Sequence, residues 1–241
     1  MGRKEGLGGL VAEKGVEATG GIGRGAGRYL HQTKRLIHES SINSRASRAT
    51  ALGEASTNRG YCHLRGRSSF EFMGLPEEVL TRVYGRPVDP DFTSWRGKPW
   101  MAIWTQHLTT IADCLGVCKF ATMWPGSTTN LGFKDFCETI EAIKGWDMTP
   151  EELMEVGERV WNLERMFNVR ESTIRRDGDM PPEVFYQPNK LEPLKGMKID
   201  RDEYEKALDE YYSLRGWNPD GTPNGETLTR LGLAAEPSHQ L

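Results

Sequence analysis

Residues 113–118 combine side chains that could hold a cofactor. Asp113 stands five residues before Cys118, and Gly116 lies between them. An aspartate can accept hydrogen bonds from an amine-bearing cofactor, and a cysteine thiolate can bind a soft metal or an iron–sulfur cluster. A glycine lets the backbone approach a bulky group. The same residues also fit a helix that ends at Gly116, with Cys114 and Cys118 as small buried side chains, and the residues alone favour this second interpretation.

Residues 57–67 contain a histidine that could transfer a proton. His63 follows Cys62 and lies among the three arginines of this segment. Nearby cations lower the pKa of an imidazole, and a neutral imidazole can both accept and donate a proton. A single histidine is more often a surface residue or a hydrogen-bonded core residue, so both interpretations of His63 stay open. Cys62 is expected to pack in the core.

The stretch before Asp113 has the apolar periodicity of a helix, which would deliver the chain to Asp113. Its apolar and aromatic positions fall on one helical face: Trp100, Ile103, Trp104, His107, Leu108 and Ile111. Because His107 lies on this face, we expect it to be a hydrogen-bonded core histidine.

Further helices are predicted along the chain, and strand signals are few. Residues 75–80 place a proline and two glutamates in a first turn, and residues 133–144 carry apolar side chains on one side. Thr149 opens a capping box and starts a helix that runs to about residue 168. A helix that begins at Asp200 and a short final helix that ends near Leu231 follow. We predict a mainly α fold without internal repeats.

Composition excludes several classes of protein. The 241 residues carry a net charge of −3, which gives no electrostatic case for nucleic-acid binding. No apolar run is long enough to span a bilayer, and the charged, Gly-rich N-terminus lacks the apolar core of a signal peptide, so we expect a cytoplasmic protein without a membrane span. The four cysteines include no CxxC pair, so no complete zinc or cluster site can be read from this chain alone.

The first 56 residues differ in composition from the rest. Residues 1–28 are rich in glycine, and residues 29–60 are polar. A glycine run can cradle phosphates, but residues 20–27 follow no clear strand and lack the dinucleotide-binding fingerprint. We therefore predict a Gly-rich and polar N-terminal remnant or linker over residues 1–56 and a helical domain over residues 57–241.

Four segments, in order, resemble the tungsten-containing aldehyde ferredoxin oxidoreductases. Residues 113–118 resemble the family's pterin- and cluster-binding motif, in which an aspartate, two variable residues, a glycine and an aliphatic residue precede a cysteine or aspartate. Residues 57–65 resemble the segment that bears the family's active-site histidine. Residues 167–171 and 211–221 resemble stretches late in its C-terminal helical domain, and residues 231–233 complete the terminal signature.

The resemblance implies a C-terminal helical domain of the aldehyde ferredoxin oxidoreductase type over residues 57–241. Full-length members begin with a β-rich pterin domain and supply three further cluster cysteines, neither of which is found in this sequence. We therefore expect a part that is inactive without a separate N-terminal portion or subunit of the same oxidoreductase.

The resemblance also implies cofactors and roles. The family carries a tungsten bis-molybdopterin and a [4Fe–4S] cluster, both of which need residues outside this chain. Cys118 would be the fourth cluster ligand, and His63 would shuttle a substrate proton near the metal. Asp113 would accept hydrogen bonds from a pterin amine, and Leu115 and Gly116 would belong to the same cofactor-binding stretch. The neighbouring Cys114 is expected to pack rather than to ligate.

The implied activity is oxidation of a small aldehyde or related carbonyl compound, with transfer of electrons to a ferredoxin-like carrier. Residues 37–43 replace a family segment that contains Asp-Pro-Arg, and together with Trp95, Trp100 and Trp104 they suggest a different branch. The catalytic subunits of benzoyl-CoA reductases, which act on an aromatic acyl-CoA, are one such branch. An alternative of another class is a non-catalytic helical remnant or interaction module.

Overall fold

The predicted mainly α fold is confirmed in the computed structural model, which describes residues 6, 8–9, 15–30, 32–34, 36–37, 44–122, 130–172 and 175–234. Within these ranges the strands are limited to a short antiparallel pair, β1 (Gln32–Thr33) and β2 (Leu36–Ile37). The α-helices are α2 (Gly15–Ile22), α3 (Arg48–Ala55), α4 (His63–Gly66), α5 (Glu77–Tyr84), α6 (Lys98–Leu115), α7 (Phe133–Lys144), α8 (Pro150–Glu171), α9 (Arg201–Arg215) and α10 (Gly225–Arg230). The 3-10 turns are η1 (Ala26–Tyr29), η2 (Ser44–Ala46), η3 (Ser69–Phe72), η4 (Lys119–Ala121), η5 (Arg176–Asp179) and η6 (Glu183–Tyr186). No described helix is long and apolar enough to cross a membrane.

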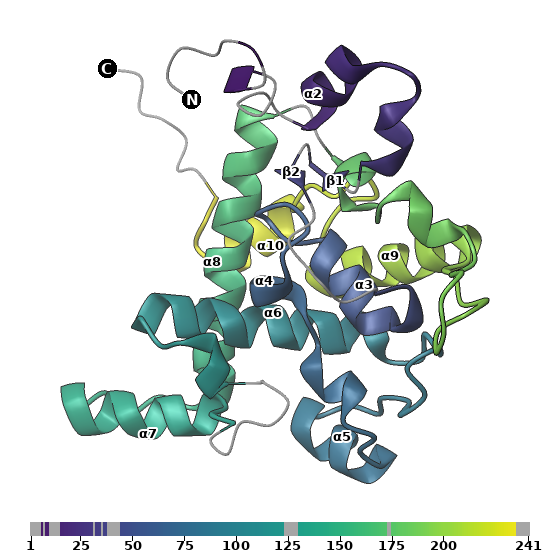
Figure 1. Ribbon diagram of the computed structural model, residues 1–241. Helices are drawn as coiled ribbons and strands as arrows, with labels where there is room; N and C mark the ends of the chain where they lie inside the picture. Colours follow the sequence, from purple (N-terminus) through teal and green to yellow (C-terminus); the bar gives the residue numbers. More distant parts are fainter. Residues whose placement is uncertain are drawn as a thin grey trace, which may run out of the picture.

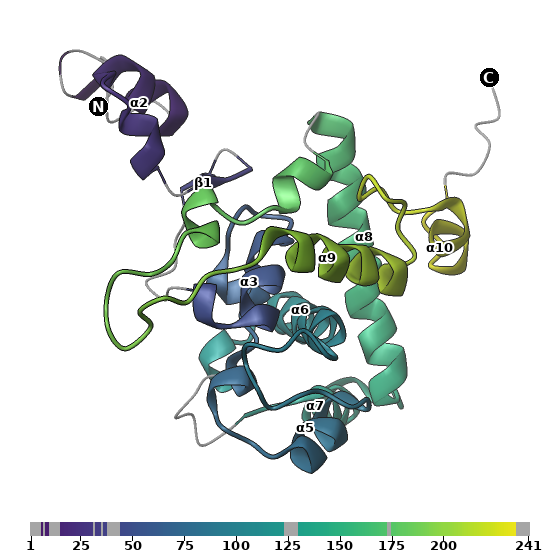
Figure 2. The same ribbon diagram turned by 90° about the vertical axis from the view of Figure 1, so that its right-hand side faces the viewer.

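Helix α6 is the central element of the fold. In Figure 1 it runs across the middle of the molecule and α8 crosses it, whereas Figure 2 looks along α6 and shows α3, α8 and α9 around it. Met101 and Leu108 pack into a core cluster with α5, α7 and the start of α8. Ala102 and Ile103 pack into a second cluster with α3, α9 and the middle of α8. Because α6 is buried on two sides, its direction fixes where Asp113 leaves the core.

A glycine lets α6 and α8 cross closely. A Cβ atom at Gly157 of α8 would lie 2.9 Å from the carbonyl oxygen of His107 on α6. His107 itself is buried, as predicted, with its Nε2 atom 3.3 Å from Nη1 of Arg215. Burial and the Arg215 charge lower the pKa of His107 well below its usual value, so the ring is neutral.

The helix boundaries agree closely with the capping signals in the sequence. The Thr149 side chain accepts from the backbone N–H of Glu152 at 3.2 Å, and the Glu152 carboxylate accepts from the N–H of Thr149 at 2.8 Å. Asp200 caps α9 through its side chain. Helix α7 has the predicted bounds, whereas α8 continues past the predicted end near residue 168 to Glu171.

Helix α3 lies in the core, although it falls within the segment predicted to be a remnant or linker. All eight of its residues are buried. The carboxylate of Glu71 accepts hydrogen bonds from the N–H groups of Ala49 at 3.0 Å and Thr50 at 2.9 Å, and so satisfies the first turn of α3. Residues 48–55 are therefore not a linker, while the interpretation of the residues before them stays a prediction.

Candidate functional site

The end of α6 carries residues 113–118 to the surface. The helix stops where Gly116 adopts a left-handed conformation with a φ of 69°, which confirms the predicted helix end. Cys114 and Cys118 are both exposed. The interpretation of these two thiols as buried core residues is therefore wrong, and Cys114 does not pack as expected.

Asp113 is held by two cations. Its Oδ2 atom lies 2.6 Å from Nζ of Lys119 and 3.6 Å from Nε of Arg65. Burial lowers the pKa of Lys119, and the bond to Asp113 opposes that shift. Because 47% of the Asp113 side chain remains exposed, the carboxylate is held in place and can still accept hydrogen bonds from a group outside the chain.

Arg65 joins the motif to the histidine segment. It lies in α4, two residues after His63, and its Nη1 atom is 2.9 Å from Oε1 of Glu164 on α8. Its guanidinium also lies over the ring of Trp161, 5.3 Å from the ring centroid. This one side chain therefore connects α4, α8 and Asp113 at the end of α6, and it brings the two predicted site segments into one region.

His63 faces the turn that follows Cys118. It is half-buried at the start of α4. Together with Lys119, Phe120 and Thr122 it lines a small cavity of about 30 Å³. The histidine and the cysteine segment, which are distant in sequence, therefore meet at the surface of the fold.

Two of the arginines near His63 have carboxylate partners. Arg65 pairs with Glu164, and Arg67 lies 3.2 Å from the buried carboxylate of Glu54. The net positive charge around His63 is therefore smaller than the number of arginines alone suggests. A low pKa for His63 stays a prediction.

Cys118 offers one exposed thiol next to Lys119 at the start of η4. Throughout the described ranges, no group of three or more histidine, cysteine or acidic side chains could hold a metal ion. Partial burial of the Cys114 sulfur and the nearby carboxylate of Asp113 raise the pKa of this otherwise exposed residue. The described side chains could provide one thiolate ligand to an iron–sulfur cluster, and they do not form a complete metal site.

A larger cavity adjoins Arg65 on the α8 side. It has a volume of about 690 Å³. Leu163 and Phe167 line it, one helical turn apart, and their side chains are 55% and 56% exposed. Large apolar side chains grouped on a surface are typical of a contact with another chain, domain or ligand.

Two residues of this region were not identified from the sequence. Arg65 could have been identified from the sequence, because it stands two residues after His63 in the segment that resembles the family. Glu164 had none, because 99 residues separate it from Arg65 and only the packing of α8 against α4 and α6 brings the two together. The site is thus assembled by tertiary structure around a recognisable local motif.

Comparison with known proteins confirms the resemblance. Residues 1–233 match the family described as "Aldehyde ferredoxin oxidoreductase, domains 2 & 3". The tungsten-containing aldehyde ferredoxin oxidoreductase of Pyrococcus furiosus is 32% identical over 234 residues, which cover 96% of this chain and 35% of the relative. The WOR-like subunit of an aliphatic sulfonate oxidoreductase from the same organism is 29% identical over 149 residues, or 59% of this chain and 23% of the relative.

The solved structures agree on the fold. The active-site complex BamBC of benzoyl coenzyme A reductase, determined with 1,5-dienoyl-CoA, superposes with a TM-score of 0.67 and 23% identity. The match covers 96% of this chain and 37% of that chain. This chain spans about a third of the length of the curated relatives that it matches first, 35% in the case of the Pyrococcus furiosus enzyme. From its match over residues 1–233, the chain belongs to the aldehyde ferredoxin oxidoreductase family and corresponds to domains 2 and 3 of that family.

Proposed function

We propose that this chain supplies the C-terminal part of the cofactor site in a tungstopterin and iron–sulfur oxidoreductase that acts on aldehydes or related carbonyl compounds. The observation that carries the proposal is the exposed motif of residues 113–118, which stands beside His63 with an incomplete set of ligands. A site that two parts of a protein complete together needs its residues on the surface of each part. The family match supports the class of cofactor.

The chain's own residues have distinct roles in this proposal. Cys118 provides one thiolate to the cluster. Asp113 accepts a hydrogen bond from the pterin, in a position fixed by its two cationic partners. At the end of α6, Leu115 and the left-handed Gly116 present backbone to the cofactor without a bulky side chain at position 116.

His63 holds the substrate proton in the proposed reaction. Its place beside the turn after Cys118 puts an imidazole next to the cofactor-binding stretch. When bound, the tungsten and the cluster supply the oxidation of the carbonyl carbon and the path of electrons to a ferredoxin-like carrier. The remaining ligands come from the N-terminal portion or subunit of the oxidoreductase.

Two other functions remain as alternatives. The fold likeness to the benzoyl coenzyme A reductase complex favours an aromatic acyl-CoA as substrate, and assays of the assembled enzyme with benzaldehyde and with benzoyl-CoA distinguish the two reactions. The other alternative is that the chain is a non-catalytic helical module. In that case the assembled protein would bind neither an iron–sulfur cluster nor a tungstopterin.

The two exposed cysteines give a matched test of the ligand assignment. The chain is co-expressed with an N-terminal portion that completes the length of the family, and the iron content and the electron paramagnetic resonance spectrum of the reduced protein are measured. We expect Cys118→Ser to lower the iron content or to change the cluster spectrum, because serine replaces a thiolate ligand. Cys114→Ser should leave both unchanged. A Cys118→Ser protein with the iron content and spectrum of the wild type refutes the assignment.

His63→Asn tests the proton-transfer role in the same assembled enzyme. We expect kcat to fall by about 10²- to 10⁴-fold, the usual contribution of a general acid or base, while iron and tungsten contents stay unchanged. Unchanged kcat and an unchanged pH–rate profile would remove His63 from the site.

A further inference from the structure

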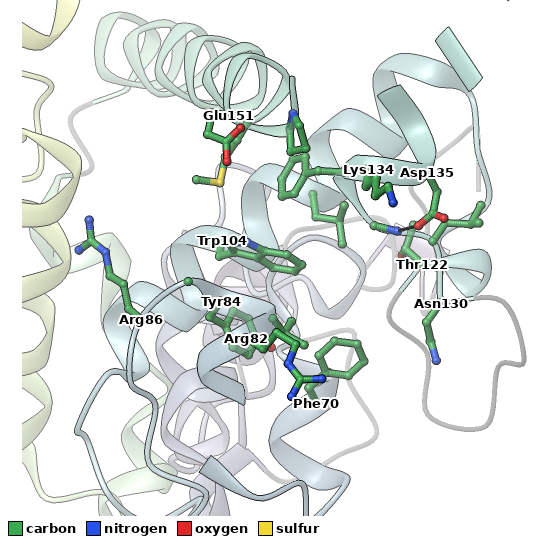
Figure 3. A pocket seen from close by; sticks show the side chains of 18 of the residues that line it. Phe70, Arg82, Tyr84, Arg86, Trp104, Thr122, Asn130, Lys134, Asp135 and Glu151 are labelled. Carbon is green, nitrogen blue, oxygen red and sulfur yellow. Dashed lines mark hydrogen bonds between the residues drawn. The ribbon is translucent and has the colours of Figure 1, made fainter. Parts of the chain in front are cut away.

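A cavity outside the candidate cofactor site lies among α5, α6 and the first turns of α7 and α8. Its volume is about 580 Å³, within the range of small-molecule pockets. Figure 3 shows Trp104 at its centre, with Tyr84 and Arg82 to one side and Glu151 and Lys134 to the other. None of these side chains has a role in the proposed cofactor site.

One wall of the cavity is a row of aromatic rings in edge-to-face contact. The centroid of Trp104 lies 5.0 Å from that of Tyr84 and 5.2 Å from that of Phe133, and Phe70 extends the row at 6.4 Å from Tyr84. Tyr84 and Phe133 are buried, so they hold Trp104 in a fixed orientation. The wall therefore offers rigid ring edges and faces to a planar apolar group.

Two guanidinium groups flank this wall. Arg82 lies on α5 and Arg86 lies just after it, and both line the cavity. In the part of the chain that the structure describes, neither forms an ion pair with an acidic side chain. The guanidinium of Arg86 lies 4.0 Å from the centroid of Trp100, which holds its charge at the edge of the aromatic surface.

The other charged side chains of the cavity are mostly engaged elsewhere. The Oδ2 atom of Asp135 accepts a hydrogen bond from the N–H of Gly132 at 2.8 Å and caps α7. Lys134 lies 3.7 Å from Glu138 on the same helix. Glu151 lies in the first turn of α8, where the helix dipole favours a negative charge. The cavity lining thus holds two arginines without an acidic partner and one glutamate, and this charge balance favours an anionic occupant.

We propose that this cavity binds a planar aromatic anion, such as a carboxylate on two fused rings, with the rings against Trp104 and the carboxylate towards Arg82 (Figure 3). A planar guanidinium matches a carboxylate in geometry and charge. Thr122 lines both this cavity and the small cavity beside His63, so a bound molecule adjoins the candidate site. The inference does not rest on the proposed function, because binding requires neither cofactor nor partner.

The sign of the ligand charge is the first test. The purified 241-residue chain is titrated by calorimetry with 2-naphthoate, with 2-naphthylmethanol as the neutral match and with 2-naphthylmethylammonium as the cationic match. We expect 2-naphthoate to bind about tenfold more tightly than the alcohol, because its carboxylate can accept a charge-assisted hydrogen bond. The affinity for 2-naphthoate should fall as salt is added. Equal or tighter binding of the ammonium compound would mean that Glu151 sets the charge preference. That result, or no binding of 2-naphthoate, overturns the proposal.

Single arginine variants then locate the ligand. Arg82→Gln should weaken 2-naphthoate binding by about five- to tenfold, since it removes a charged hydrogen-bond donor. Arg86→Gln, on the other side of the aromatic wall (Figure 3), should weaken binding less. Both side chains are exposed, so the fold should persist. The control is Arg96→Gln, which removes another exposed arginine that pairs with Glu77 at 2.7 Å, and it should leave binding unchanged. Wild-type affinity in the Arg82→Gln variant would place the ligand elsewhere and overturn the assignment.

Discussion

At the scale of single residues, the carboxylate of Asp179 is a buried charge with several partners. It is fully buried, and its oxygens lie 2.7 Å from Nη2 of Arg165, 2.8 Å from Nζ of Lys34 and 2.6 Å from the hydroxyl of Tyr212. Burial alone raises a carboxyl pKa, but the charges of Arg165 and Lys34 outweigh it and hold the pKa of Asp179 below its usual value. The group thus joins the β1–β2 turn to α8 and α9.

Removal of this charge should be costly. We expect Asp179→Asn to lower the free energy of unfolding by about 3–5 kcal/mol, because it leaves two buried cations without their partner. Urea unfolding at pH 7 measures the change. The control is Asp209→Asn, in which the 2.6 Å contact with Arg176 is lost at a side chain that is 64% exposed, and we expect less than about 1 kcal/mol there. Equal effects in the two variants would contradict the structural role of Asp179.

The same carboxylate predicts how stability depends on pH. Because its folded pKa lies below the unfolded value of about 3.9, its contribution is complete above that value and is lost as the pH falls through the folded pKa. The difference in unfolding free energy between wild type and Asp179→Asn should therefore stay constant from pH 7 to about 5 and narrow below about pH 4. Urea unfolding at several pH values tests this. A difference that narrows already between pH 7 and 5 would require a raised pKa instead.

At the scale of elements, the crossing of α6 and α8 sets the position of the candidate site. A methyl group at Gly157 would lie 2.9 Å from the carbonyl oxygen of His107 and 3.2 Å from its Cα atom. We expect Gly157→Ala to destabilise the protein by about 1–3 kcal/mol through forced separation of the helices, although alanine favours helix by about 1 kcal/mol. Thermal unfolding of Gly157→Ala and of Gly225→Ala, whose Cβ meets nothing within 4 Å, gives a matched comparison. A Gly157→Ala protein as stable as the wild type would show that the crossing tolerates a side chain.

Local sequence signals predicted the ends of several helices but did not predict helix α3, which lies in the core. The capping box at Thr149 and the break at Gly116 are encoded within a few residues, and both were predicted. Helix α3 was not predicted, because it is short and lies within a polar segment, and because its first turn is satisfied by Glu71, more than 20 residues away. Its burial depends on a carboxylate supplied by tertiary structure.

The candidate site also has parts that could be predicted from the sequence and parts that could not. Residues 113–118 and His63 were proposed as site residues from their resemblance to two short segments of the family, each of which can be compared within a few residues. Their meeting through Arg65 and Glu164 could not be predicted, because it depends on how α4 and α8 pack against the end of α6. The exposure of Leu163 and Phe167 was also beyond the sequence, in which they share the apolar pattern of α8.

At the scale of the whole molecule, the main feature is that the proposed cofactor motif, residues 113–118, lies on the surface. The chain spans 35% of the length of the Pyrococcus furiosus relative and belongs to domains 2 and 3 of the family. The exposed thiol of Cys118, the half-exposed carboxylate of Asp113 and the adjoining apolar cavity form one face. We interpret this face as the half of a cofactor site that another portion of the oxidoreductase completes.

The most direct test of this account is the metal content of the purified 241-residue chain, measured by elemental analysis together with its visible absorbance. The described residues provide two exposed thiols, Cys114 and Cys118, and no group of three or more side chains that could hold a metal ion. We therefore predict neither iron nor tungsten in stoichiometric amount and no absorbance from an iron–sulfur cluster. Assembly with the N-terminal portion should introduce both metals. Stoichiometric iron and tungsten in the isolated chain would contradict the account.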